Sequence, residues 1–285
     1  MIATSTRPVP VATPADHPVL KALLSQPHLA VMGVLNVTPD SFSDGGQFSE
    51  PELALAQARQ MIAEGADIID IGAESTRPYG AQPVSADEEL RRLQPMLGKV
   101  VSLGTHVSID SMKSTVVAWA LGAGAAIAND VWGLQRDPDM AGVIADHRAP
   151  VIVMHNRDSA DPAIDIMQDI AAFFARSLEI AAKAGIPDRH IVLDPGIGFG
   201  KTPEQSMIAL ARLDELRTFG LPLLVGASRK RFISTVTPSE PHQRLGGSIA
   251  AHILAARNGA RVIRTHDVSE TVQALRVTAA IEDKR

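Results

Sequence analysis

Short apolar segments recur along the chain at nearly regular intervals, and a polar residue follows each of them. Continuous apolar runs of this length are typical of strands that are buried on both faces of a parallel sheet. We therefore expect eight parallel strands. The runs are Ala30–Leu35, Ile68–Ile71, Val107–Ile109, Ala125–Ala128, Val151–Met154, Ile191–Leu193, Leu223–Val225 and Val262–Ile263.

The segments between these runs contain helix start signals. Ser49, Ser85, Thr202 and Asp267 are each followed three residues later by Glu or Gln. This spacing is that of a capping box, or of its Asp variant, at the beginning of a helix. Residues 203–217 also place apolar side chains at helical spacing, which predicts a helix with one buried face.

The alternation of strand and helix predicts the fold class. The polar residues that follow the eight runs are about 33 residues apart on average, the length of one strand–helix repeat. Eight such repeats favour a single (β/α)8 TIM barrel, of class α/β, over an open doubly wound sheet. We expect residues 1–28, with prolines at positions 8, 10, 14 and 18, to form a loose N-terminal tail and residues 29–283 to form one barrel domain.

Composition excludes several classes of protein. The 285 residues include 27 Lys and Arg against 32 Asp and Glu, a net charge of −5 that argues against a nucleic-acid partner. The chain contains no cysteine, which excludes disulfides, thiol nucleophiles and Cys-ligated metals. Neither a signal peptide nor a stretch of about 20 apolar residues is evident, so we expect no membrane partner and a cytoplasmic location.

The residues that follow the predicted strands have a distinctive chemistry. The active site of a TIM barrel lies at the carboxyl ends of its strands. Asp110 and Asp194 can accept paired hydrogen bonds from a flat nitrogen heterocycle. The basic side chains suit a phosphate group, and they are Arg77, Arg229, Lys230, Arg264 and His266. The pattern predicts a ligand with a heterocycle at one end and phosphate at the other, bound beside the glycine-rich turn 194–201.

These residues lie in motifs that resemble those of dihydropteroate synthases. The segment Met32–Gly46 resembles the first signature of that family and Ile71–Pro78 resembles the second. The similarity spans roughly residues 30–280. It continues through Ser108–Asp110, Asn129–Asp130, Met154–His155, Leu193–Lys201, Ser228–Lys230 and Arg264–Asp267. Two positions differ from the commonest form of the family motifs: Ser111, where Thr is usual, and Thr265, where Val is usual.

The resemblance implies an activity. Dihydropteroate synthases join 6-hydroxymethyl-7,8-dihydropterin pyrophosphate to p-aminobenzoate, giving dihydropteroate and pyrophosphate in folate synthesis. It also implies Mg²⁺ as cofactor, the two small molecules as partners, and a homodimer. Residues 243–258, with the small side chains Gly246, Gly247, Ala250 and Ala251, are candidates for close helix packing in such a dimer.

The resemblance further implies roles for individual residues. The pterin would be held by Asp110, Asn129, Asp194 and Lys230. The pyrophosphate would be bound by Asn36, Thr76, Arg77, Arg264 and His266. The p-aminobenzoate pocket would be formed by Phe42, Thr76, Pro78, Phe199 and Lys230. Asn36 would also be the ligand for Mg²⁺, and we expect Arg264 to serve the diphosphate and not the pterin ring.

Three questions stay open at this point. A pterin-binding methyltransferase barrel shares the Asp and Asn positions, although the combination of Thr76–Pro78 with Ser228–Lys230 argues against it. A paralogue that binds pterin without catalysis is a second alternative. His155 follows the fifth strand and suits equally a site residue or a structural one.

Overall fold

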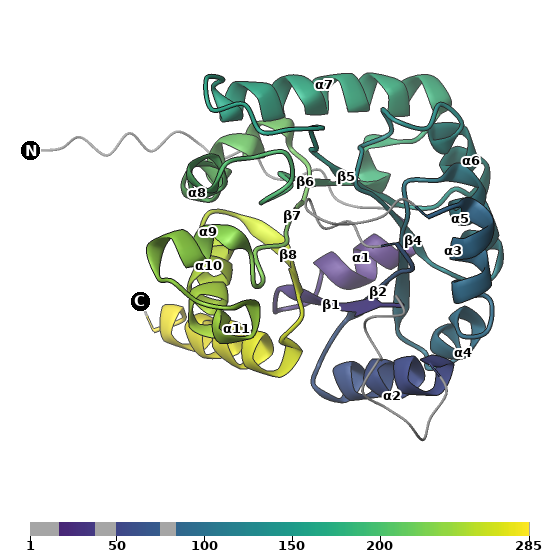
Figure 1. Ribbon diagram of the computed structural model, residues 1–285, viewed down its shortest axis with the longest axis horizontal. Coiled ribbons are helices and arrows are strands. Elements are labelled where there is room, and N and C mark those ends of the chain that lie inside the picture. The colour runs from purple at the N-terminus through teal and green to yellow at the C-terminus, as the bar shows by residue number, and fades with distance from the viewer. Residues whose placement is uncertain (1–16, 38–49, 75–83, 285) are drawn as a thin grey trace, which may run out of the picture.

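The computed structural model describes residues 17–37, 50–74 and 84–284 and has a closed barrel of parallel strands at its centre (Figure 1). Each strand pairs with the next in the chain, and β8 pairs with β1. The barrel confirms the predicted fold class and all eight predicted strands. They are β1 (Ala30–Asn36), β2 (Ile68–Gly72), β3 (His106–Asp110), β4 (Ile127–Asp130), β5 (Val151–Met154), β6 (Ile191–Asp194), β7 (Leu223–Val225) and β8 (Ala260–Thr265).

Helices surround the barrel and cover its outer face (Figure 1). Each strand of a parallel barrel needs a crossover helix to return the chain to the same end. Those described are α2 (Glu50–Ala63), α3 (Ala86–Leu93), α4 (Leu97–Val101), α5 (Ser114–Gly122), α6 (Met140–His147), α7 (Ile166–Ala184), α8 (Pro203–Ala211), α9 (Arg231–Val236), α10 (Leu245–Arg257) and α11 (Val268–Glu282), with short 3₁₀ helices η2 (Asp188–His190), η3 (Leu213–Phe219) and η4 (Pro241–Gln243). None of the helices in the described residues is both long enough and apolar enough to cross a membrane.

The predicted helix caps have different outcomes. Thr202 forms a complete capping box with Gln205 at the start of α8, and the Ser85 side chain accepts from the Glu88 N–H at the start of α3. Asp267 precedes α11 but its side chain does not cap that helix, because its carboxylate is paired with Arg229. Ser49 lies outside the described residues.

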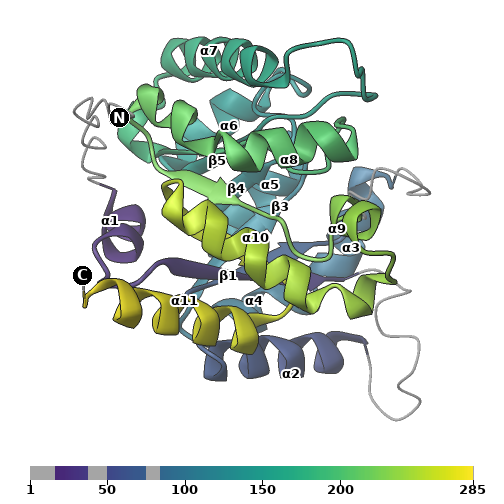
Figure 2. The same ribbon diagram turned by 90° about the vertical axis from the view of Figure 1, so that its left-hand side faces the viewer.

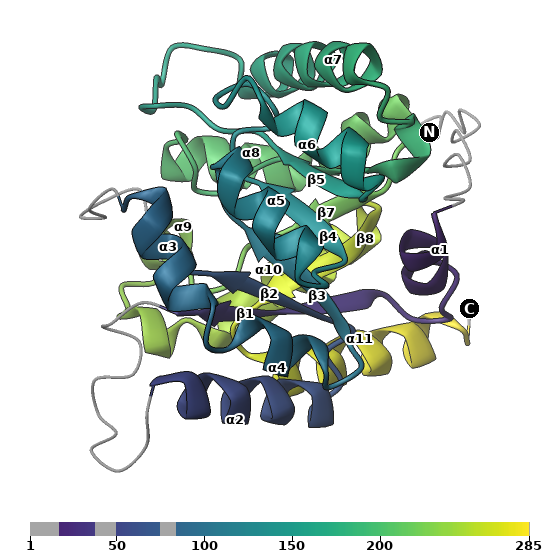
Figure 3. The same cartoon turned by 90° about the vertical axis from the view of Figure 1, so that its right-hand side faces the viewer.

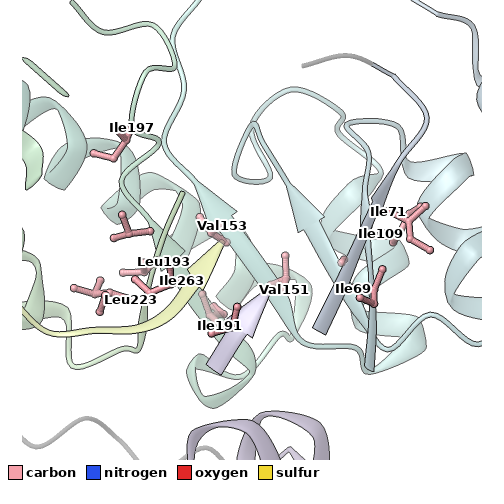
Figure 4. Close-up of a cluster of buried hydrophobic side chains, with 14 of the residues drawn as sticks. Ile69, Ile71, Ile109, Val151, Val153, Ile191, Leu193, Ile197, Leu223 and Ile263 are labelled. Atoms are coloured by element: carbon pink, nitrogen blue, oxygen red, sulfur yellow. The ribbon is translucent and has the colours of Figure 1, made fainter. Parts of the chain in front are cut away.

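Strand side chains alternate between two hydrophobic layers. Outward side chains such as Ile69, Ile71 and Ile263 pack between the barrel and its helices, in the cluster shown in Figure 4. Inward side chains such as Ile68 and Val262 belong to a separate cluster inside the barrel. This period of two is the ordinary geometry of a strand, and it decides which residues line the barrel interior.

The first helix, α1 (Pro18–Leu24), lies within residues 1–28, for which the sequence predicted a loose tail, and shows that this prediction is wrong for residues 18–24. Leu20 and Leu23 are 3% and 2% exposed and pack in the inner cluster with Met32 and Ile152. Figures 2 and 3 place α1 at one end of the barrel and α9 at the other. Pro18 is compatible with this helix because it occupies the first turn, where no backbone N–H is needed. The amino-terminal end of the barrel is therefore covered by α1.

Candidate functional site

The carboxyl ends of the strands bring the predicted polar residues together. Asn36, Gly72, Asp110 and Asn129 occupy one continuous row of paired positions across β1, β2, β3 and β4. Asp194 ends β6, opposite Met154 of β5. The register therefore brings the amide and carboxylate side chains together at the carboxyl end of the barrel.

Arg264 connects two carboxylates inside the barrel. Its Nε donates to Asp70 Oδ2 at 2.6 Å and its Nη2 donates to Asp110 Oδ2 at 2.8 Å. Burial acts to lower the pKa of Arg264, but Asp70 and Asp110 outweigh it and raise that pKa. The guanidinium therefore stays charged and holds both carboxylates in place.

Asp110 retains one free acceptor. Its Oδ1 is buried and accepts no hydrogen bond within the described residues. Burial, followed by the nearby charge of Asp70, raises the pKa of Asp110 to about 7, while Arg264 opposes the rise. A buried oxygen without a donor is costly, so a ligand N–H at this position would be strongly favoured.

Asn129 and Asp70 form the floor of the same site. Asn129 Nδ2 donates to Asp70 Oδ2 at 3.1 Å, and both side chains are buried. Sequence reasoning missed Asp70, which lies within the second apolar run. The signal that could have found it is a carboxylate inside an apolar run. Ile68 points into the barrel, and Asp70, two positions later on the same strand, points inward as well.

Asp194 is held by the glycine-rich turn that follows it. Its Oδ1 accepts from the Gly196 N–H at 2.7 Å, and burial raises the pKa of Asp194 to about 6. Gly196 has φ +64°, and a Cβ there would lie 1.9 Å from the carbonyl oxygen of His155. Only glycine fits this position, so the turn and the end of β5 are in direct backbone contact.

Lys230 and Phe199 form the other wall of the site. The Lys230 Nζ lies 4.0 Å from the centre of the Phe199 ring, a cation–π contact. Burial and then Arg264 lower the pKa of Lys230 to about 8, against the opposing effect of Asp194 and Asp110. Phe199 also packs with Val131 and Met154 in a small apolar cluster. This wall of the site thus places an apolar face beside the Lys230 ammonium.

His266 and Ser228 form a pair at the ends of β8 and β7. The Ser228 Oγ accepts from the His266 backbone N–H at 3.2 Å and lies 3.0 Å from the His266 Nδ1. Burial, then Arg264, lowers the pKa of His266 to about 3, so the ring is neutral. When the Ser228 hydroxyl donates to Nδ1, the ring proton is on Nε2 and available to an anion.

Arg229 has a partner of its own. It pairs with Asp267 through Nε at 3.1 Å and through a second, shorter contact from Nη2. Its backbone is left-handed, with φ +58°, and its N–H donates to the Ser248 Oγ of α10. The structure therefore assigns Arg229 to the shape of this loop more than to phosphate.

The remaining predicted residues divide into two groups. Asn36 ends β1 at the rim and is partly exposed, and His155 is fully buried between Asp169 and Lys201. Phe42, Thr76, Arg77 and Pro78 lie outside the described residues.

Comparisons with known proteins agree with this site. Residues 32–266 match the family model of pterin binding enzymes. The dihydropteroate synthase of Bacillus subtilis is 41% identical over 273 residues, covering 95% of each chain. The structure of a dihydropteroate synthase from Clostridium difficile in the presence of pteroic acid has a TM-score of 0.86 and 47% identity, covering 90% of this chain and 97% of that one.

A second solved structure is equally similar in fold. The dihydropteroate synthase of Xanthomonas albilineans with 4-aminobenzoic acid has a TM-score of 0.86 and 44% identity, covering 91% of this chain and 94% of that one. The family match, over residues 32–266, contains every described strand-end residue discussed above. The chain therefore belongs to the family of pterin binding enzymes and, within it, to the dihydropteroate synthases.

Proposed function

We propose that the barrel mouth binds 6-hydroxymethyl-7,8-dihydropterin pyrophosphate, joins it to p-aminobenzoate and releases pyrophosphate. The observation that supports this best is the buried Asp110 Oδ1, an acceptor without a donor, beside Asn129, Asp194 and Lys230. A pterin has N–H donors and ring acceptors along one edge and can satisfy such a set. Relatives with pteroic acid and 4-aminobenzoic acid support the same chemistry.

The pterin lies deepest in this proposal. Asp194 accepts from the 2-amino and N3 hydrogens, and Lys230 donates to a ring acceptor. A bidentate pair of this kind is worth about 1–3 kcal/mol of discrimination, by analogy with base-edge contacts. Asp110 and Asn129 complete the polar contacts, and their fixed positions in the strand register support this assignment.

The pyrophosphate lies nearer the rim. Asn36, Arg264 and His266 are the described residues of this subsite, and Thr76 and Arg77 are proposed with them from the family motif. Support comes from the charge of Arg264 and from the neutral His266 ring, whose Nε2 can donate. These groups stabilise the negative charge that develops on the departing diphosphate.

Mg²⁺ is proposed as the cofactor, held by Asn36 and the substrate phosphates. In the described part of the chain no cluster of three His, Cys, Asp or Glu side chains is arranged to hold a metal ion. A single protein oxygen fits Mg²⁺, which keeps several waters and binds substrate phosphates readily. When bound, the ion would neutralise charge on the diphosphate.

The proposed reaction does not require a general base from the protein. As the C–O bond to pyrophosphate breaks, its electron pair leaves with pyrophosphate, and the positive charge that develops on the methylene carbon is spread over the dihydropterin ring, so substitution is dissociative. The arylamine is uncharged at neutral pH and attacks without a general base. Its pocket would be formed by Phe42, Thr76, Pro78, Phe199 and Lys230. The protein positions the amine and stabilises the leaving group.

A homodimer through α10 and α11 is the proposed assembly. Gly246, Ala250 and Leu254 follow one another at intervals of four on α10, and all three are exposed. Val277 and Ile281 of α11 are 54% and 61% exposed, also at an interval of four. Two other candidates are used within the chain, since Ala251 is in the core and Gly247 packs against Ile233.

The cytoplasm is the proposed location. Support comes from the lack of cysteine, which suits a reducing compartment.

An assay of pyrophosphate release with both substrates tests the proposed reaction. Release that requires p-aminobenzoate supports the synthase. A methyltransferase barrel would release none, and an inactive paralogue would bind the pterin substrate without turning it over. The relatives that match along the whole barrel favour the first outcome.

A further inference from the structure

Lys201 ends the glycine-rich turn and is buried beneath the proposed site, with 7% of its surface exposed. Its Nζ lies 2.6 Å from His155 Nδ1 and donates to the Phe199 carbonyl oxygen at 3.1 Å. A buried lysine is rare unless its donors are used. Both of these contacts are internal to the protein, so Lys201 is occupied by structure around the site.

The hydrogen bonds continue beyond His155 to the surface. His155 Nε2 lies 3.0 Å from Asp169 Oδ2, and the same oxygen accepts from Arg157 Nη1 at 2.8 Å. An ionised carboxylate only accepts, which puts the ring proton of His155 on Nε2. The His155 Nδ1 is then the acceptor for Lys201. Donation therefore runs from Lys201 through His155 to Asp169, which also accepts from Arg157, so four residues from three segments form one hydrogen-bonded chain.

The backbone of the turn is tied to the same segment by close contacts. The His155 N–H donates to the Asp194 carbonyl at 2.9 Å. A Cβ at Gly200 would lie 2.5 Å from the carbonyl oxygen of Arg157, and Gly200 has φ +53°. These contacts do not involve the Lys201 side chain. Asp194 is thus held by His155 and Gly196 without a hydrogen bond from Lys201, whereas the Phe199 carbonyl accepts directly from the Lys201 ammonium.

We propose that Lys201 is a positioning residue, which holds Phe199 in place under Lys230 through the hydrogen-bonded chain Arg157–Asp169–His155–Lys201. Lys201 contacts Phe199 through the backbone carbonyl, and the ring of Phe199 lies 4.0 Å from the Lys230 Nζ. The inference rests on the proposed function, in which Phe199 and Lys230 line the p-aminobenzoate pocket. Asp194, the main contact of the pterin, keeps its own supports.

The substitution Lys201→Met tests this assignment, because it keeps the apolar stem and removes both hydrogen bonds. The KM for p-aminobenzoate should rise about tenfold, the factor expected for one hydrogen bond from a charged group. The dissociation constant of pterin pyrophosphate, measured by calorimetry, should change by less than about threefold. Lys201→Arg, which retains donors, should recover part of the loss. Lys183→Met, an exposed lysine of α7, is the matched control.

A second variant covers the case in which Lys201→Met does not fold. Asp169→Asn weakens the outer end of the chain at a side chain that is 26% exposed. It should raise the KM for p-aminobenzoate in the same direction by a smaller factor. In a double-mutant cycle with Lys201→Met, the two effects should fall short of their sum, since both act through His155.

The outcomes separate this inference from the proposed function. Wild-type protein that forms no dihydropteroate contradicts the function itself. Active wild type, with folded variants that change both substrates by the same factor or change neither, overturns the role of Lys201. A selective effect on p-aminobenzoate with recovery in Lys201→Arg supports it.

Discussion

Arg264 donates from Nη2 to Asp110 Oδ2 at 2.8 Å, so a residue assigned to the diphosphate and a residue assigned to the pterin form one hydrogen-bonded pair. The same guanidinium also binds Asp70. From the sequence we expected Arg264 to serve the diphosphate alone. In the structure its removal leaves two buried carboxylates without their cation, which must affect the pterin subsite as well.

Arg264→Ala should therefore weaken binding of a bare pterin in addition to pterin pyrophosphate. Removing one partner of a buried ion pair typically destabilises a protein by about 3–5 kcal/mol, so the free energy of unfolding should also fall. Calorimetry with both ligands, beside a denaturant titration, measures the two effects. Arg59→Ala, on the exposed face of α2, is the control. Unchanged affinity for bare pterin would restrict Arg264 to the diphosphate.

Asp194→Asn should weaken binding of pterin pyrophosphate while leaving the protein folded. The new amide presents a donor to a ligand donor, and a buried mismatch costs about 1–3 kcal/mol before the lost charge is counted. Calorimetry gives the affinity and circular dichroism confirms the fold. Near wild-type affinity in a folded variant would remove Asp194 from the pterin site.

Pterin affinity should fall as the pH is lowered through about 6. Burial raises the pKa of Asp194 to about 6 in the free protein, and ligand N–H donors favour its ionised form. Below that pH, binding of the ligand therefore releases a proton from Asp194. The affinity should drop about tenfold for each further pH unit. Titrations between pH 5 and 7.5 measure the slope.

The raised pKa of Asp194 also determines the direction in which its contribution to the free energy of unfolding changes with pH. Because the folded state holds the Asp194 proton more tightly than the unfolded chain, this residue makes the free energy of unfolding fall as the pH rises from about 4 to 6. Asp194→Asn should lose that part of the pH dependence in both affinity and stability. If the variant keeps the wild-type pH dependence, that dependence belongs to another group, and Asp110 is the next candidate.

Asn36→Ala should raise the Mg²⁺ concentration needed for half-maximal rate. The loss of one oxygen ligand weakens the binding of Mg²⁺, which still has its water ligands and the substrate phosphates. Initial rates over a Mg²⁺ titration provide the measurement, and chelation of the ion should reduce the rate of both proteins. Identical Mg²⁺ curves would show that Asn36 has no role at the metal.

Leu23→Ala should destabilise the barrel without changing the site. Leu23 is 2% exposed and packs inside the amino-terminal end, far from the strand carboxyl ends. Truncating a buried leucine costs about 2–5 kcal/mol. A denaturant titration gives the difference, and KM values for both substrates should match wild type. An unaltered midpoint would mean that α1 adds little to stability.

The eight strands and most of the strand-end residues could be predicted because their signals are local. Each apolar run and the polar residue after it, such as Asn129 or Asp194, are adjacent in the chain. Asp70 could not be assigned in the same way, since its partner Arg264 is 194 positions away and only barrel closure brings them together.

The errors near helix starts have a similar cause. Asp267 has the spacing of a cap, yet its carboxylate is used by Arg229, which is 38 positions earlier. The prolines before residue 19 suggested a loose tail, but Pro18 begins α1. In both cases tertiary contacts decided between two local structures that the same residues allow.

The position of α1 has a consequence for the order of events. Because Leu20, Leu23 and Met32 pack the amino-terminal end of the barrel, we expect both proposed substrates to enter and both products to leave through the mouth. A pterin that binds deepest must arrive first, before p-aminobenzoate occupies the outer wall. Pyrophosphate, nearer the rim, must depart before dihydropteroate can withdraw its ring from Asp194. If the proposed function holds, we therefore expect turnover to be sequential.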